Sequence, residues 1–142
     1  MLLPDVNILV YAHRVDMPGH IPCRDWLGEV LETGERITLP DLVAVGFLRV
    51  ASNPRAFRQP STLQDARTVV EAIYASQGFY AANSGPKAIA RMLASVPQTP
   101  VTGATTTDAY IAAIALEMGA TLVTADGGFR RYPGLELLNP LG

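Results

Sequence analysis

Three aspartates of this chain have the residue type and the spacing to do chemistry together: Asp5, Asp108 and Asp126. Asp5 follows an apolar opening at 1–4, and Asp126 follows the strand-like run at 121–125. Asp108 stands before the strongly helical run at 109–116. In an open parallel sheet, ligands bind at the carboxyl ends of the strands. If these segments pack together, the three carboxylates meet in one cleft.

Carboxylates that lie close together cannot all ionise cheaply unless a cation neutralises them. A site with only oxygen ligands suits a hard ion such as Mg²⁺ or Mn²⁺. The three acids therefore predict a metal-dependent enzyme that acts on phosphate. Each acid also has a structural interpretation, because Asp5 and Asp108 suit helix starts and Asp126 suits the turn before Gly127-Gly128. Their shared edge of the expected sheet favours the functional interpretation.

The composition is that of one folded domain of 142 residues, with 49% hydrophobic and 17% charged residues. The single cysteine, Cys23, excludes an internal disulfide and fits a reducing cytoplasm. The opening does not read as a secretory signal, and we expect no membrane span. A net charge of −2 argues against a protein that holds nucleic acid through a broad basic face. It leaves room for an RNA enzyme, because a metal supplies positive charge at the reacting phosphate.

Strand and helix patterns alternate along the chain, which predicts a single α/β domain at 1–142 with a mostly parallel sheet. The predicted helices are residues 7–13, 23–33, 42–51, about 62–76, 86–93 and one opened by Asp108. The predicted strands are residues 2–5, 36–39, 79–81, 121–124 and 135–138, and residues 96–107 are expected to form a loop.

Several of these segments, taken in order, resemble a known family. Residues 3–12 (LPDVNILVYA) resemble the first motif of PIN-domain ribonucleases, in particular VapC-type toxins of bacterial toxin–antitoxin modules. Residues 46–55 are similar to the middle helix of that family, and residues 108–126 to its C-terminal acidic motifs. The ending at 132–135 is similar as well. The resemblance covers nearly the whole chain.

The resemblance implies a Mg²⁺- or Mn²⁺-dependent endoribonuclease that acts on tRNA or mRNA, a VapB-like antitoxin that blocks the acidic cleft, and a homodimer. By the same resemblance, Asp5 and Asp108 are the main metal ligands and Asp126 completes the cluster. Asn7 and Thr124 are expected to hold the carboxylates or metal-bound waters by hydrogen bonds.

The chain departs from the family pattern at two positions. Many members carry a fourth acid, usually Glu, where this chain has Ala44, and another acid where it has Gly128. Asp41, about one helical turn before Ala44, is a candidate replacement, although helix capping after Pro40 explains it equally well.

The arginines offer contacts to RNA phosphate. Arg49 and Arg55 are candidates through forked hydrogen bonds, whereas Arg58 is interpreted as a solubilising surface charge. Arg130 and Arg131 follow Asp126 closely, so they are expected to offset its charge or to contact RNA. The two histidines, His13 and His20, are too few for a zinc site.

Three alternatives stay open from the sequence. Ala44 and Gly128 support a binding domain that kept the fold but lost the reaction. A phosphatase or receiver module with Asp5 as phosphoacceptor is less favoured, because Lys87 is the only lysine and is distant in sequence from every expected strand end. Finally, two apolar helix stripes belong either to contact faces or to the core, and their residues are Val43, Phe47, Leu48, Val69, Val70 and Ile73.

Overall fold

The computed structural model describes residues 1–95 and 98–142, and it has a five-stranded sheet with the order β3-β2-β1-β4-β5. Every strand pair described is parallel, as the alternating sequence pattern predicts. The strands are β1 (Leu2–Pro4), β2 (Ile37–Thr38), β3 (Phe79–Tyr80), β4 (Thr121–Val123) and β5 (Leu137–Leu138). The central pair, β1 and β4, aligns Pro4 with Val123. The prediction of an α/β domain is confirmed.

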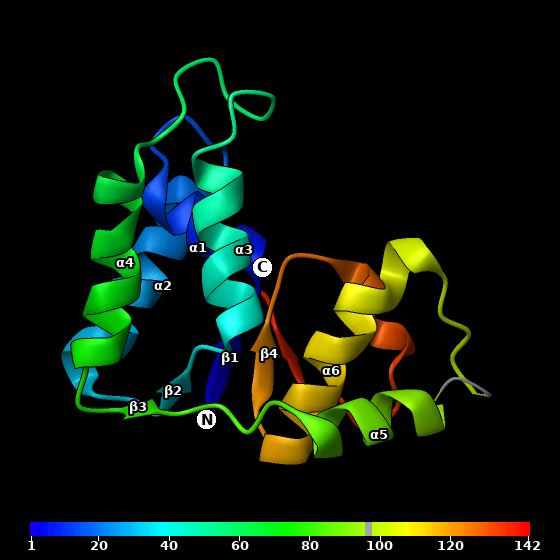
Figure 1. The fold of residues 1–142 in the computed structure, drawn as a ribbon. Helices are drawn as coiled ribbons and strands as arrows, with labels where there is room; N and C mark the ends of the chain where they lie inside the picture. Colours follow the sequence, from blue (N-terminus) through cyan, green and yellow to red (C-terminus); the bar gives the residue numbers. More distant parts are fainter. Residues whose placement is uncertain (96–97) are drawn as a thin grey trace.

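Six α-helices and two short 3-10 helices surround the sheet in the described part of the chain (Figure 1). The α-helices are α1 (Val6–His13), α2 (His20–Thr33), α3 (Asp41–Ala51), α4 (Leu63–Ala75), α5 (Pro86–Ser95) and α6 (Thr106–Met118). The 3-10 helices are η1 (Gly103–Thr105) and η2 (Gly127–Arg131). In Figure 1, α1 to α4 gather on one side of the central strands and α5 and α6 on the other. Of the described helices, none combines the length and apolarity needed to cross a membrane.

Most boundaries fall within one or two residues of the sequence prediction, and three segments differ. Helix α2 starts three residues earlier than predicted, at His20, whose buried ring bonds through Nδ1 to the carbonyl oxygen of Tyr11 at 2.9 Å. The predicted loop at 96–107 includes η1 and the start of α6, while its residues 96 and 97 lie outside the described residues. A reciprocal capping box between Thr102 and Thr105 stabilises that start. The expected Gly-Gly turn is the beginning of η2.

The apolar stripes left open by the sequence belong to the core. Val43, Phe47 and Ile73 are fully buried, Val70 is 8% exposed, and Leu48 and Val69 pack against them. Cys23 is buried as well. Contact faces for partners must therefore come from other side chains.

Candidate active site at the carboxyl edge of the sheet

The site is built where the strand order reverses. From β1 the chain adds strands outward to β2 and β3, and it later returns to add β4 and β5 on the other side of β1. Ligand sites of open α/β sheets form at such a switch point, outside the carboxyl ends of the strands. Asp5 directly follows β1, and its N–H donates to the carbonyl oxygen of Val123 at the end of β4 (2.9 Å). The two strand ends that carry Asp5 and Asp126 are therefore direct neighbours.

Asp5 is the most buried acid of the site, at 7% exposure. Its Oδ1 accepts a hydrogen bond from the N–H of Val6 (2.7 Å), so that the side chain caps α1. Its Oδ2 accepts a hydrogen bond from the hydroxyl of Thr124 (2.9 Å). The capping interpretation and the functional interpretation of Asp5 are thus compatible, because each carboxylate oxygen keeps further acceptor capacity.

Thr124 links two of the acidic segments. Its hydroxyl is 3% exposed, donates to Asp5 and accepts the backbone N–H of Asp126 (3.0 Å). One buried hydroxyl therefore fixes the Asp5 carboxylate relative to the turn after β4. That geometry is the one expected of a residue that holds a carboxylate in place.

Asp108 and Asp126 complete the set from α6 and η2. Asp108 lies in the first turn of α6, where the positive end of the helix dipole favours a carboxylate. The prediction that Asp108 opens this helix was wrong by two residues, because the chain enters it through η1 at Thr106. Asp126 is exposed and caps η2, its Oδ1 accepting the N–H of Gly128 at 2.8 Å.

The electrostatics show that the three acids share one environment. Burial raises the pKa of Asp5 above its ordinary 3.8, the hydrogen bonds from Thr124 and Val6 oppose that rise, and the charges of Asp108 and Asp126 add to it. Burial also raises the pKa of Asp108; the charge of Asp126 adds to the rise and that of Arg131 opposes it. The structure therefore brings Asp5, Asp108 and Asp126 within electrostatic reach of one another.

The donor set fits a hard cation in its chemistry, since all three side chains offer oxygen and two of them carry raised pKa values. In the described residues, no three His, Cys, Asp or Glu side chains stand close enough together to form a ready-made metal cage. Asp5 and Asp126 each commit one oxygen to a backbone N–H. The carboxylates would have to turn inward together to share one ion.

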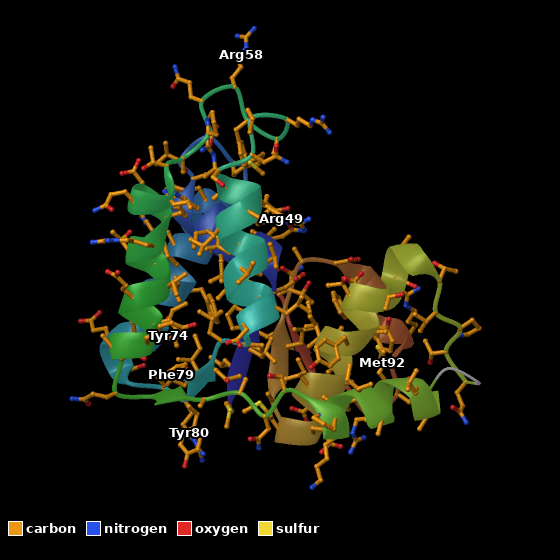
Figure 2. The ribbon with its side chains drawn as sticks, viewed as in Figure 1. Arg49, Arg58, Tyr74, Phe79, Tyr80 and Met92 are labelled. Carbon is orange, nitrogen blue, oxygen red and sulfur yellow. The ribbon has the colours of Figure 1, made fainter. Side chains whose placement is uncertain are left out.

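The other residues singled out in the sequence lie around this edge or beyond it. Asn7 is exposed on α1, and in the described structure no hydrogen bond joins its amide to Asp5. Asp41 is exposed at the first residue of α3, while Ala44, the position of the fourth acid in many family members, is buried. Arg49 projects from α3, as Figure 2 shows, and Arg55 is exposed in the loop that follows.

Two arginines matter more than the sequence indicated. The positive charge that offsets the acidic cluster belongs to Arg131 and acts on Asp108, whereas the guanidinium of Arg130 lies beside Gly127. Arg14 is buried at the end of α1, at 8% exposure, and forms a two-pronged pair with Asp16. The spacing of Arg14 and Asp16 hints at that pair, but no sequence pattern reveals that an arginine is buried.

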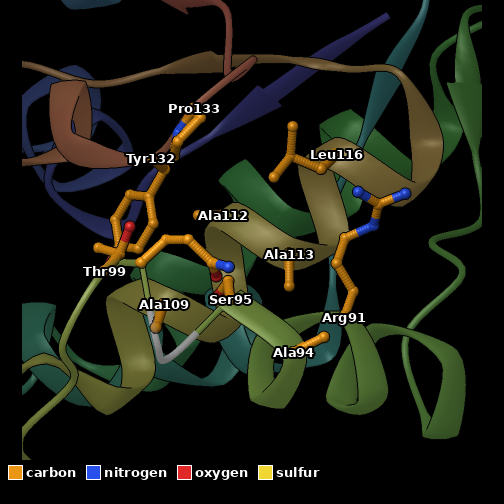
Figure 3. A pocket seen from close by; sticks show the side chains of 11 residues that line it. Arg91, Ala94, Ser95, Thr99, Ala109, Ala112, Ala113, Leu116, Tyr132 and Pro133 are labelled. Carbon is orange, nitrogen blue, oxygen red and sulfur yellow. The ribbon is translucent and has the colours of Figure 1, made fainter.

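A separate pocket of about 340 Å³ lies between α5 and α6 (Figure 3). Its wall is mostly apolar, with Ala109, Ala112, Ala113 and Leu116 from α6 and Tyr132 and Pro133 opposite. The three aspartates do not line it. The acidic edge and this pocket are therefore distinct features of the molecule.

The fold, the switch point and the acidic triad together match a known class. The family model for the PIN domain matches residues 2–135, so the chain belongs to the PIN domain family. Within that family its relatives are VapC proteins. It is 40% identical to Ribonuclease VapC43 of Mycobacterium tuberculosis (strain ATCC 25618 / H37Rv) over 143 residues, which cover 99% of this chain and 96% of the relative. It is 34% identical to Ribonuclease VapC25 of the same strain, with 99% of both chains covered.

Solved structures show the same fold at lower identity. The VapBC2 structure from Rickettsia felis, bound to a promoter DNA fragment, contains a chain that matches with a TM-score of 0.67 at 18% identity, covering 97% of both chains. The FitAcB structure from Neisseria gonorrhoeae matches with a TM-score of 0.66 at 17% identity, covering 99% of both chains. These likenesses establish the architecture over essentially the whole chain.

Proposed function

We propose that this chain is the endoribonuclease toxin of a toxin–antitoxin module, and that it hydrolyses RNA phosphodiester bonds at the edge formed by Asp5, Asp108 and Asp126. The observation that carries the proposal is the meeting of these acids at the switch point between β1 and β4. The VapC ribonucleases among its relatives support the same activity. The reaction belongs in the cytoplasm, where tRNA and mRNA are found.

The proposed cofactor is Mg²⁺ or Mn²⁺, held by Asp5, Asp108 and Asp126. When bound, such an ion generates a nucleophile from water at neutral pH and stabilises charge on the phosphate. Thr124 holds the Asp5 carboxylate in place, and Asn7 stands one helical residue further on, exposed to the incoming strand. Asp41 remains a candidate fourth acid, but the charges acting on Asp5 come from the other two aspartates, so a three-acid site is proposed.

RNA contacts are proposed for Arg49, Arg55 and Arg130, three exposed guanidinium groups around the acidic edge and the loop beyond α3. Guanidinium groups bind phosphate through paired hydrogen bonds, which suits a site that must hold a polyanion beside carboxylates.

A VapB-like antitoxin is the proposed protein partner, because the structural neighbours VapBC2 and FitAcB are named as complexes of this kind. A homodimer is also proposed. Leu42 and Val45 on α3 are 38% and 63% exposed, and they line an open pocket with Tyr110 and Ile114 of α6. An exposed apolar patch of this kind marks an interface. Val45→Glu should shift the chain toward monomer in light scattering, and an unchanged mass would reject α3 as the dimer face.

The activity is tested by incubating purified protein with a pool of total tRNA and mRNA in Mg²⁺, in Mn²⁺ and in EDTA. Discrete products that need the metal and vanish in Asp5→Asn are expected. Asp25→Asn is the matched control, because Asp25 is an exposed acid on α2 that pairs with Arg24 away from the acidic edge. Equal cleavage by the Asp5 variant would assign the products to contamination.

The second candidate is a PIN-fold binding domain without catalysis, favoured by Ala44 and Gly128 at positions where many members carry acids. It predicts RNA or antitoxin binding with no metal-dependent products from any pool.

A further inference from the structure

One segment of this acidic protein is distinctly basic. Residues 42–64 contain Arg49, Arg55 and Arg58 and no Asp or Glu, in a chain whose net charge is −2. All three arginines are exposed. Figure 2 shows Arg49 partway along α3 and Arg58 at the outer end of the loop between α3 and α4. We name this loop, residues 52–62, the arginine arm.

The arginine arm is fastened to the body by buried Arg14. The guanidinium of Arg14 donates through Nη1 to Ser61 Oγ (3.1 Å) and through Nη2 to the carbonyl oxygen of Gln59 (3.0 Å). It also lies over the ring of Phe57, 3.8 Å from the ring centroid. Asp16 holds the same guanidinium by two hydrogen bonds of 2.9 and 2.8 Å. Because Asp16 neutralises it, Arg14 serves as an anchor and leaves the arm to contact solutes.

Further bonds hold both ends of the arm. His13 Nε2 lies 2.9 Å from Ser61 Oγ, and the N–H of Ser61 donates to the carbonyl oxygen of Ala51 (2.9 Å). Near the start of the arm, the side chain of Asn53 accepts the N–H of Arg55 (3.0 Å). A loop ordered in advance loses less conformational entropy when it binds. The arm therefore presents Arg55 and Arg58 from a rigid support.

Helix α1 sets the distance between the arm and the acidic edge. Asp5 caps its first turn, and His13 and Arg14 stand at its last. Eight helical residues at about 1.5 Å each separate the two ends by about 12 Å. An RNA strand bound at the acids reaches the arm within a few nucleotides.

The acids near the arm do not cancel its charge. Asp16 is engaged with Arg14, and Asp65 at the start of α4 shares with Arg58 an open pocket of about 590 Å³ at the base of the arm. Counting Arg55 and Arg58 against Asp65 leaves the outer face of the arm positive. Forked guanidinium groups favour phosphate over an isolated carboxylate-free surface.

We propose that the arginine arm is a second RNA-binding surface of this ribonuclease, in which Arg55 and Arg58 hold backbone phosphates away from the cleaved bond and Arg14 is their positioning residue. The inference rests on the proposed function, since it presumes an RNA strand at the acidic edge. It replaces the interpretation of Arg58 as a solubilising charge.

The test measures binding separately from cleavage. In an Asp5→Asn background, which stops hydrolysis, a labelled single-stranded RNA oligonucleotide of mixed sequence is titrated by fluorescence anisotropy at several salt concentrations. Each lost phosphate contact on single-stranded RNA lowers the slope of log affinity against log salt by about 0.7. Arg55→Gln with Arg58→Gln should therefore lower that slope by about 1.4.

The matched control removes two exposed arginines elsewhere. Arg24→Gln with Arg67→Gln changes the net charge equally, at residues that pair with Asp25 and Glu71 on α2 and α4. This control should leave the slope unchanged. A slope that falls equally in both double variants would overturn the arm, because the effect would then be net charge alone.

Arg14→Lys tests the positioning role, because it keeps the charge but loses the fork and the planar contact with Phe57. Amide hydrogen exchange within the arm should become faster, and RNA affinity should fall as in the double variant. For cleavage with Asp5 restored, KM should rise while kcat stays the same, the pattern of lost uniform binding. Faster exchange in the arm with unchanged RNA affinity would overturn the positioning role.

The outcomes separate this inference from the proposed function. If wild type cleaves no RNA pool but the arm variants still weaken RNA binding, the proposed function fails and the arm stands. If wild type cleaves and the arm variants bind RNA as the control does, the arm fails alone. Weaker antitoxin binding with intact RNA binding would make the arm a protein interface and overturn its assignment to RNA. No RNA binding by the parent protein would overturn both.

Discussion

At the scale of single residues, the hydroxyl of Thr124 has the most consequence for its size. It satisfies one oxygen of the buried Asp5 carboxylate and also the backbone N–H of Asp126. Thr124→Val keeps the shape and removes both bonds. Because the carboxylate then loses a charge-assisted partner, we expect the free energy of unfolding to fall by about 1.5–3 kcal/mol.

Urea denaturation measures that change, and the RNA pool assay should show a parallel loss of cleavage. Thr124→Ser is the matched control, since it keeps the hydroxyl and should keep most of the stability. If the Val variant is as stable as wild type, the Thr124 hydroxyl does not hold Asp5.

A second prediction at this scale concerns pH. The folded state raises the pKa of Asp5 above its ordinary 3.8, so the native state binds the Asp5 proton more tightly than the unfolded state does. Stability in EDTA should therefore contain a contribution from Asp5 that is present at low pH and is lost as pH rises through the raised pKa. Asp108 acts in the same direction.

Asp5→Asn removes that titration. The difference in unfolding free energy between wild type and this variant, measured in urea across a pH series from about 3 upward, should shift in favour of the variant as pH rises. Taking the difference removes the opposite contribution of Asp16, whose pKa is lowered by its bond to Arg14. A difference that does not change with pH would show that Asp5 titrates alike in both states.

At the scale of elements, close backbone approaches set the sheet. A Cβ at Gly78, just before β3, would collide with the carbonyl oxygen of Glu35, just before β2. Gly78→Ala should cost about 1–3 kcal/mol or more, since backbone atoms cannot move aside as a side chain can. Gly28→Ala in the exposed interior of α2 meets no atom within 4 Å and should stabilise by about 0.5–1 kcal/mol. Thermal melts of the two variants should move in opposite directions.

The elements also show what the sequence could predict. Hydrophobic period and glycine stops located α3, α4, α6 and β4 to within two residues, because strong local patterns decide such segments. The stretch from 98 to 107 carries no such period, and η1 with its Thr102–Thr105 capping box was missed there. The His20 start of α2 depends on a contact with Tyr11, which is a tertiary interaction and leaves no local pattern.

The candidate site follows the same division. Asp5, Asp108 and Asp126 could be selected because strand ends and helix starts are local features, and the topology brought them together. The roles of Arg14 and Arg131 could not be predicted, because burial of a guanidinium and its direction toward Asp108 arise only when distant segments pack. The bond from Thr124 to Asp5 spans 119 residues of sequence and was expected only from the family resemblance.

At the scale of the whole molecule, the acidic edge is a concentration of unpaired negative charge that the fold alone does not neutralise. Of the charges that act on Asp5 and Asp108, Arg131 is the positive one. A cation that binds the folded state alone must therefore stabilise the whole domain. At a free metal concentration about 100 times its dissociation constant, the gain is about 2.7 kcal/mol.

Melting temperature should accordingly rise with Mg²⁺ or Mn²⁺ over an EDTA baseline, and Asp108→Asn should remove most of that rise. Asp25→Asn, the exposed acid of α2, should keep the full rise and so exclude a general ionic effect. The response should also disappear as pH falls through the raised pKa values of Asp5 and Asp108, because protonated carboxyls do not bind the ion. A flat response in wild type at neutral pH would mean that the three acids bind no metal, and a binding domain without catalysis would then be the better description.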